Sequence, residues 1–183
     1  MRLIAFLIFL LAPPALAQDA QGNDTPGDWR VTHTAHFGLW DSVCDERGPA
    51  EALQQRCYIR YVDVFSPRPE FAAHFVFVTP AQDGVEIQYG SEPGTRFVRD
   101  GNRIETSAAP LWVATQNGCL TGGSCVFVGA EATFLYEALK TAKSWRFQFA
   151  DRHGKIQDLT WDLTPFAEAA ADFEAEATAR GLR

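Results

Sequence analysis

Residues 71–78 read Phe-Ala-Ala-His-Phe-Val-Phe-Val, and this stretch decides the fold class of the chain. Successive side chains of a β-strand point to opposite faces, so the run divides into two sets. One face carries Phe71, Ala73, Phe75 and Phe77, and the other carries Ala72, His74, Val76 and Val78. Because Phe and Val favour pleated sheets, the run predicts a strand in an antiparallel sheet.

Similar alternating runs follow at residues 85–89, 145–149 and 159–163, with turn residues at 82–84 and 151–154. Asp100-Gly101 separates residues 95–98 from 103–107, and this dipeptide is typical of a two-residue hairpin turn. Short strands at such spacing predict a mainly β fold. We expect an antiparallel β-sandwich, or an open barrel, of about eight to ten strands.

Two segments have helical rather than strand periodicity. Residues 130–143 and 165–180 place apolar side chains three and four positions apart, with charged residues between them. Pro165 suits the first position of a helix, and Gly181 suits its end. We therefore expect two peripheral helices beside the sheets.

The composition limits the function classes. The chain has 183 residues, 16 Lys and Arg against 23 Asp and Glu, and a formal net charge of −7. An acidic chain is a poor ligand for nucleic acid, which selects a basic face. Residues 18–28 lack large apolar side chains and predict a disordered leader, whereas residues 29–183 predict one domain.

The first 17 residues have the three parts of a secretory signal peptide. Arg2 supplies a positive charge, residues 3–12 are continuously apolar, and Ala15-Leu16-Ala17 precedes a predicted cleavage site. The apolar run is too short for a transmembrane helix, and no later run reaches 18 residues. No cysteine follows the site, which excludes lipid attachment there. The expected location is periplasmic or secreted.

Export affects the interpretation of Cys44, Cys57, Cys119 and Cys125. An oxidising compartment favours disulfides, and four cysteines allow three pairings. The short intervals favour Cys44–Cys57 and Cys119–Cys125, without excluding the other two pairings. Neither spacing fits a zinc site or a C-x-x-C redox motif.

No residue pattern predicts catalysis, a metal site or a cofactor. Ser124 lies beside a cysteine rather than in a nucleophile motif. His33 and His36 are three apart on a predicted strand and point to opposite faces, while His153 lies in a turn. His74 lies among valines, which favours a buried, hydrogen-bonded histidine over a ligand.

The tryptophans are the remaining candidates for binding. Trp40, Trp112, Trp145 and Trp161 all fall on predicted strands and are expected mainly in the core. A tryptophan at the surface would be able to bind a ligand or a partner. Trp40 and Trp112 are the candidate binding residues on this basis.

Several motifs resemble one known family. Residues 37–44 read Phe-Gly-Leu-Trp-Asp-Ser-Val-Cys, followed by Cys57, and a second group comprises residues 110–113, 117–119 and 123–125. Together with residues 135–139, 145–149 and 163–169, they resemble the invasion-associated locus B family. The resemblance implies a bacterial envelope protein that is exported, disulfide-bonded and β-rich. It implies no catalytic residues.

The leading hypothesis is therefore a non-enzymatic, exported envelope protein that binds another envelope or surface component. A second hypothesis is a small-ligand or glycan-binding module that uses an exposed aromatic side chain on a sheet face. A third is a hydrolase whose site is dispersed, with His74 meeting an Asp or Ser from other strands. The sequence does not identify the partner, whether protein or glycan, or the oligomeric state.

Overall fold

The computed structural model describes residues 29–66, 71–107 and 109–183. The expected signal peptide, residues 1–17, and the expected leader, residues 18–28, lie outside these ranges. The described strands are β1 (Arg30–Phe37), β2 (Trp40–Arg47), β3 (Gln54–Ser66), β4 (Ala72–Ala81), β5 (Gly84–Ser91), β6 (Arg96–Glu105), β7 (Pro110–Val113), β8 (Ser124–Phe127), β9 (Ser144–Ala150) and β10 (Ile156–Asp162). The helices are α1 (Asn117–Leu120), α2 (Gly129–Thr141) and α3 (Phe166–Ala179), and residues Ala50–Ala52 form a 3-10 turn.

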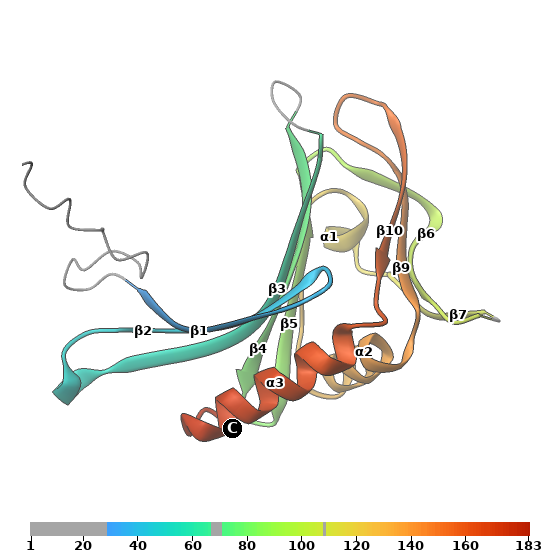
Figure 1. The fold of residues 1–183 in the computed structure, drawn as a ribbon. Coiled ribbons are helices and arrows are strands. Elements are labelled where there is room, and N and C mark those ends of the chain that lie inside the picture. Colours follow the sequence, from blue (N-terminus) through green and yellow to red (C-terminus); the bar gives the residue numbers. More distant parts are fainter. Residues whose placement is uncertain (1–28, 67–70, 108) are drawn as a thin grey trace, which may run out of the picture.

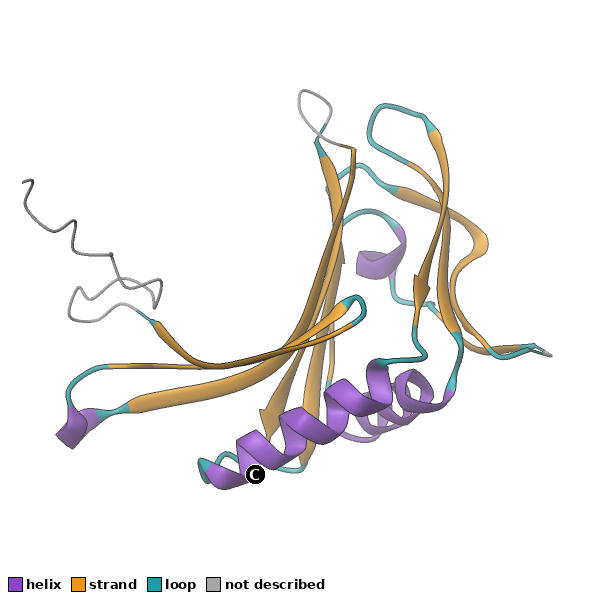
Figure 2. Ribbon diagram, in the orientation of Figure 1, coloured by secondary structure: helices purple, strands orange, loops and turns teal. Residues whose placement is uncertain are grey.

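The strands form two antiparallel sheets, which confirms the expected mainly β class. One sheet has the strand order β1-β2-β3-β4-β5-β8, and the other has the order β10-β9-β6-β7. The run at residues 71–78 lies almost entirely in β4, inside the larger sheet. Figure 2 shows the sheets in orange, with α2 and α3 below the space between them.

An aromatic core fills the space between the two sheets. Trp145 and Phe147 of β9 lie 5.2 and 5.9 Å from Tyr89 of β5, measured between ring centroids. Edge-to-face and offset ring pairs at such distances add to the free energy gained by burying their apolar surface. Helices α2 and α3 close one end of this core, where Phe166 packs 4.9 Å from Trp40 and 5.9 Å from Tyr136.

Strand β3 belongs to two parts of the larger sheet. Residues 54–60 pair with β2, and residues 59–66 pair with β4. In Figure 1, β3 runs from the β1–β2 hairpin toward the connection between β3 and β4. Helix α3 packs on the hairpin, where His33 Nε2 lies 2.8 Å from an Asp172 carboxylate oxygen. Pairing with β2 reaches only as far as Arg60, so residues 61–66 of β3 pair with β4 alone.

The hairpin expected at Asp100-Gly101 is wrong. These residues lie within β6, where the partner of Phe97 is Phe149 and the partner of Asn102 is Phe147. Four residues of β6 thus oppose one residue of β9, which makes a large bulge instead of a chain reversal. Asp100 alone of the two residues has a left-handed conformation, with φ 55°, and both flanking segments pair with the same neighbouring strand.

The two predicted helices are confirmed, with ends shifted by one or two residues. The segment predicted at 130–143 forms α2 at Gly129–Thr141, and the segment predicted at 165–180 forms α3 at Phe166–Ala179. Helix α1 and the 3-10 turn are additional short elements. Among the described residues, none of the helices has the length and apolar character needed to cross a membrane.

One disulfide joins two strands of the larger sheet, and a second joins α1 to that sheet. Cys44 and Cys57 lie directly opposite each other on β2 and β3 and are bonded. Cys119 of α1 is bonded to Cys125 of β8. This is the pairing that their spacing favours. Each disulfide closes a local loop, which reduces the entropy of the unfolded chain.

Candidate functional site

His74 lies at the centre of the aromatic core. Its side chain is fully buried, and the ring centroids of Phe65, Phe147 and Phe149 lie 4.8–4.9 Å from its own. Burial lowers the pKa of His74 from 6.5 to about 3, so the ring is neutral at pH 7. Its Nδ1 lies 3.5 Å from the Tyr89 hydroxyl, and its Nε2 has no hydrogen-bond partner within the described part of the chain.

The strand register brings an aspartate and a serine to His74. Asp63 of β3 is the pairing partner of His74, and Ser91 of β5 is its partner on the other side. These residue types match those of a dispersed hydrolase site, but no hydrogen bond of the described residues joins the three side chains. Asp63 Oδ2 instead accepts a 3.0 Å hydrogen bond from Trp161 Nε1. Burial strongly raises the pKa of the Tyr89 hydroxyl, and the nearby Ser91 side chain lowers it in part. Ser91 Oγ itself has no hydrogen-bond partner among the described residues.

The arrangement around His74 is closed to a substrate. A nucleophile must reach both a base and a reacting carbon, and neither His74 nor Ser91 has appreciable exposure. The aromatic rings around the imidazole occupy the space that a substrate would need. No group of three or more His, Cys, Asp or Glu side chains that could hold a metal ion occurs in the described ranges.

The tryptophan candidates lie in or beside the core. Trp40 is fully buried, and its Nε1 donates a 3.1 Å hydrogen bond to the Asp162 carbonyl oxygen. Trp40 therefore lies in the core, as mainly expected, and lacks the surface that its candidate binding role requires. Trp145 and Trp161 are also buried, and the half-buried Trp112 packs edge-on against Trp145 at 5.9 Å. Strand β2 directs the Trp40 side chain toward α3, where it packs against Phe166, rather than toward solvent.

The remaining histidines lie where the strand pattern predicts. His33 contacts Asp172 of α3, whereas His36 contacts Asp41 on the opposite face of the hairpin, with 2.6 Å between Nδ1 and a carboxylate oxygen. His153 lies in the turn between β9 and β10. None of these contacts assembles a cluster with a second histidine.

The strongest candidate for a binding surface is the outer face of the six-stranded sheet. We use the name aromatic face for Tyr58, Val62, Val64, Phe75, Phe77 and Val126. Val62, Val64 and Val126 are 48%, 47% and 46% exposed, and the three rings are partly exposed. The Phe77 centroid lies 5.8 Å from that of Phe75 and 6.1 Å from that of Tyr58. The rings therefore form a continuous row across β3 and β4.

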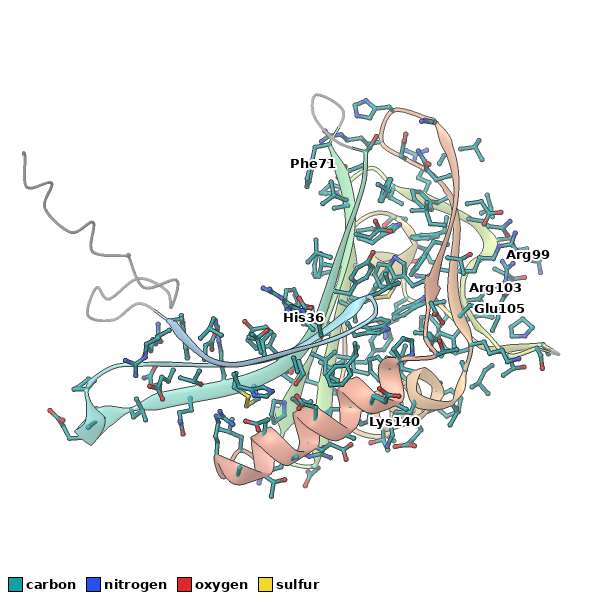
Figure 3. The ribbon with its side chains drawn as sticks, viewed as in Figure 1. His36, Phe71, Arg99, Arg103, Glu105 and Lys140 are labelled. Atoms are coloured by element: carbon teal, nitrogen blue, oxygen red, sulfur yellow. A yellow bond between two sulfur atoms is a disulfide. The ribbon has the colours of Figure 1, made fainter. Side chains whose placement is uncertain are left out.

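A glycine on the neighbouring strand makes room for the Phe75 ring. Gly90 is the pairing partner of Phe75, and a Cβ at Gly90 would lie 2.3 Å from the end of the Phe75 ring. The ring thus lies over the glycine backbone. Exposed Phe71, labelled in Figure 3 near the β3–β4 connection, continues the apolar character beyond β4.

Paired charges border the aromatic face. Arg56 donates hydrogen bonds of 2.6 and 3.0 Å to the two oxygens of Asp45, and its guanidinium lies 3.8 Å from the Trp29 ring centroid. Burial and the Asp45 charge raise the pKa of Tyr58, whose hydroxyl also donates to Asp45. These contacts fix the polar border and leave the apolar row uncovered by α2 and α3, which pack on the inner face.

The outer face of the four-stranded sheet has the opposite character. Arg146 donates hydrogen bonds of 2.9 and 2.7 Å to the carboxylate of Asp158, and these bonds lower the pKa of Asp158 to about 2. Arg103 pairs with Glu105 and donates to Gln148 at 2.9 Å. Figure 3 shows Arg103 and Glu105 close together beside β6. This face is a solvated network of charges, so the two outer faces of the molecule are chemically different.

The sequence analysis did not predict the aromatic face, although residues 71–78 contain a pattern that indicates it. The run at residues 71–78 is apolar on both sides, whereas a half-buried strand has one polar side. An apolar outer side indicates either a covering element or a binding surface.

A shallow groove lies where the aromatic face meets the β1–β2 hairpin. It is lined by Gly38, Leu39, Asp41, Arg60, Tyr61 and Val62, with a volume of about 430 Å³. Arg60 Nε lies 3.3 Å from an Asp41 oxygen, and the Arg60 side chain is 46% exposed. The groove therefore combines an apolar wall with an accessible guanidinium.

Comparisons with known proteins give limited information. No family model matches the sequence. No curated protein matches it. Among solved structures, the chain is similar to the crystal structure of invasion associated protein B from Bartonella henselae, with 16% identity and a TM-score of 0.48. The alignment covers 81% of this chain and 99% of that chain. At this level of similarity, no residue role passes from that protein to this one.

Proposed function

We propose that this protein is an exported, non-enzymatic envelope protein that binds another envelope or surface protein through the aromatic face. The observation that carries the proposal is the row of three partly exposed rings flanked by three valines that are each nearly half exposed. Water-exposed apolar surface is unfavourable, so a contiguous patch on a folded domain indicates an interaction surface.

Two features support export. The first 17 residues have the composition of a secretory signal, and all four cysteines of the chain are in disulfides. Structural disulfides persist in oxidising compartments and are rare where thiols are kept reduced. Periplasmic or secreted location is part of the proposal on these grounds.

The side chains on the aromatic face favour a protein partner over a glycan. Sugar recognition needs several polar groups beside an aromatic ring, and the Arg56 and Tyr58 side chains on this face are already hydrogen-bonded to Asp45. Valine and phenylalanine side chains suit an apolar protein surface, where burial itself supplies the driving force. The buried position of Trp40 also removes one of the residues on which a glycan-binding module would depend.

The closed surroundings of His74 support a role without catalysis. Among the described residues that the register brings together here, His74 and Ser91 are buried, Asp63 accepts from Trp161, and no hydrogen bonds link the three side chains into a relay. We therefore assign this group to the packing of the core and the binding function to the sheet surface.

Site-specific photo-crosslinking tests the proposal. A benzophenone amino acid replaces Val126 on the aromatic face, and in a matched control it replaces Ile156, which is 73% exposed on the other sheet. We expect a discrete crosslinked partner from position 126 and none from position 156, in cells that produce the protein naturally. The adduct should disappear when Phe77→Asp is added. Equal crosslinking from both positions, or none from position 126, would overturn the proposal.

A further inference from the structure

The carboxyl-terminal half of β3 has an unpaired edge. Pairing with β2 ends at Arg60 opposite Asp41, whereas pairing with β4 continues to Ser66. In the described structure, residues 61–66 therefore have a strand partner on one side only. We call residues 61–64 the free edge, because the pairing becomes irregular between Val64 and Ser66. Backbone amide and carbonyl groups on such an edge can pair with another strand.

The other sheet edges carry features that oppose strand addition. Strand β1 has a bulge and carries Arg30, His33 and His36, and β10 carries Asp158 and Asp162. Strands β7 and β8 are only four residues long, and β7 begins with a proline. Charge, bulges, proline and short length all oppose strand addition. The free edge is equally short and has Asp63 on its inner side, but its outer side exposes two β-branched side chains, Val62 and Val64.

The groove lies at one end of the free edge, where it would meet the end of an added strand. Strand β2 is antiparallel to β3 and occupies the edge next to residues 54–60. An antiparallel strand added beside residues 61–64 would run in the direction of β2 and would have to stop at Gly38 and Leu39. Its carboxyl end would therefore enter the groove beside Arg60. A guanidinium that is 46% exposed is a suitable partner for a carboxylate.

We propose that the free edge binds an extended segment at the carboxyl terminus of the partner protein, as an added antiparallel strand. The inference rests on the proposed function and specifies how the partner is held. Main-chain hydrogen bonds would join the segment to residues 61–64, and the terminal carboxylate would contact Arg60. Alternate apolar side chains would lie beside Val62 and Val64, at the border of the aromatic face. A hydroxyl or amino side chain would face Asp63 on the inner side.

The charge of Asp63 disfavours a second copy of this chain as the occupant. When two free edges pair so that Val62 faces Val64 of the other copy, the two Asp63 side chains stand directly opposite each other. Like charges at directly opposed positions destabilise an antiparallel pair. The net charge of −7 on each chain adds a repulsion between copies. A segment with a donor at this position has no such conflict.

The test uses the disulfide-bonded protein and a pool of fluorescein-labelled heptapeptides. The pool has Val, Ile, Leu or Phe at the two positions beside the valines, and Thr, Ser or Lys between them. We expect saturable binding by members with a free carboxyl terminus, and about tenfold weaker binding by their amides, in line with one charge-assisted contact. Arg60→Gln should abolish this difference, and Val62→Lys should abolish binding. Ile156→Lys is the matched control and should bind like the unaltered protein.

Backbone methylation identifies strand addition without altering the protein. Two versions of the best peptide carry N-methyl groups at alternate positions, so that only one version loses the amides that face β3. One version should lose binding by at least about tenfold and the other should keep it. Equal effects of both versions, or no binding by any peptide at 1 mM, would overturn the inference. So would a dimer, detected by sedimentation, that Val62→Lys dissociates.

The results separate this inference from the proposed function. If position 126 crosslinks to a partner while every peptide fails, the aromatic face binds but the free edge does not accept a strand. If the peptides bind as expected while position 126 gives no adduct, the edge binds a segment and the proposed role of the aromatic face is wrong.

Discussion

Replacing His74 with phenylalanine should make the protein less sensitive to acid. The imidazole is packed among aromatic rings on β4, and its Nε2 is buried without a hydrogen-bond partner among the described residues. Protonation would place a positive charge in this apolar site. The native protein therefore resists protonation of His74, and its pKa falls from 6.5 to about 3.

The direction and size of the effect follow from the two pKa values. Below pH 6.5 the unfolded chain takes up a proton on His74, whereas the folded chain does not until about pH 3. Acid therefore favours unfolding, and the free energy of unfolding falls as the pH decreases through this window. The loss approaches about 1.4 kcal/mol per pH unit below pH 6.5 and totals about 2.7 kcal/mol between pH 7.5 and 4.5.

The assay is urea denaturation followed by tryptophan fluorescence, at four pH values between 7.5 and 4.5, with both disulfides intact. Carboxylates with lowered pKa, such as Asp158 and Asp162, also lose stabilising contacts in acid. They do so equally in both proteins, so the difference between wild type and H74F isolates His74. Ile156→Ala is the control, because Ile156 is 73% exposed and does not titrate.

We expect the difference in unfolding free energy between wild type and H74F to change by about 2.7 kcal/mol across the range, while the difference between wild type and I156A stays constant. H74L separates the charge effect from ring packing, because it should show the same pH dependence with a different offset. A constant difference between wild type and both His74 variants would refute the assignment of a neutral, buried His74.

Two further predictions concern stability. Replacing Cys44 and Cys57 together by alanine should lower the free energy of unfolding by about 3 kcal/mol, measured by denaturation at pH 7.5, because the bond joins residues 13 positions apart; an unchanged midpoint would contradict this. Gly101→Ala should cost at least about 2 kcal/mol, because its Cβ would lie 2.2 Å from the Gln148 carbonyl oxygen. Gly90→Ala should lower the free energy of unfolding by no more than about 1 kcal/mol, because its Cβ meets only the end of the Phe75 ring, which can move. Equal losses of stability in the two glycine variants would contradict this reasoning.

Local periodicity was sufficient to predict the fold class. The alternation at residues 71–78 predicts β4, and it also places His74 on the buried side. The helical periods predict α2 and α3 nearly to their ends. These features depend on side chains that are close together in the chain, so a single sequence contains the necessary information.

Features that depend on strand register were not predictable. The Asp100-Gly101 dipeptide has the composition of a hairpin turn, but its two flanks pair with the same strand, β9. Asp63, His74 and Ser91 are brought together only because β3, β4 and β5 pair in one particular register. A shift of a single residue would send these side chains to opposite faces.

The candidate site was predicted least well for the same reason. Trp40 is on a strand, as expected, but the packing of α3 decides that it is buried. The free edge exists because β2 ends opposite Arg60 while β3 continues, and the length of one strand relative to its neighbour is a tertiary property. Of the aromatic face, only the part on β4, Phe75 and Phe77, is indicated by the local sequence pattern.

The packing of α3 on the first hairpin constrains the order in which the molecule can be completed. Helix α3 follows all ten strands, yet it supplies Phe166 against Trp40 and Asp172 against His33, a contact that spans 139 positions. When a chain emerges amino end first, β1 and β2 precede the helix that covers them by more than a hundred residues. During that interval the tryptophan side of the hairpin faces water, so a chaperone that shields it would act on the earliest strands and be released by the last helix.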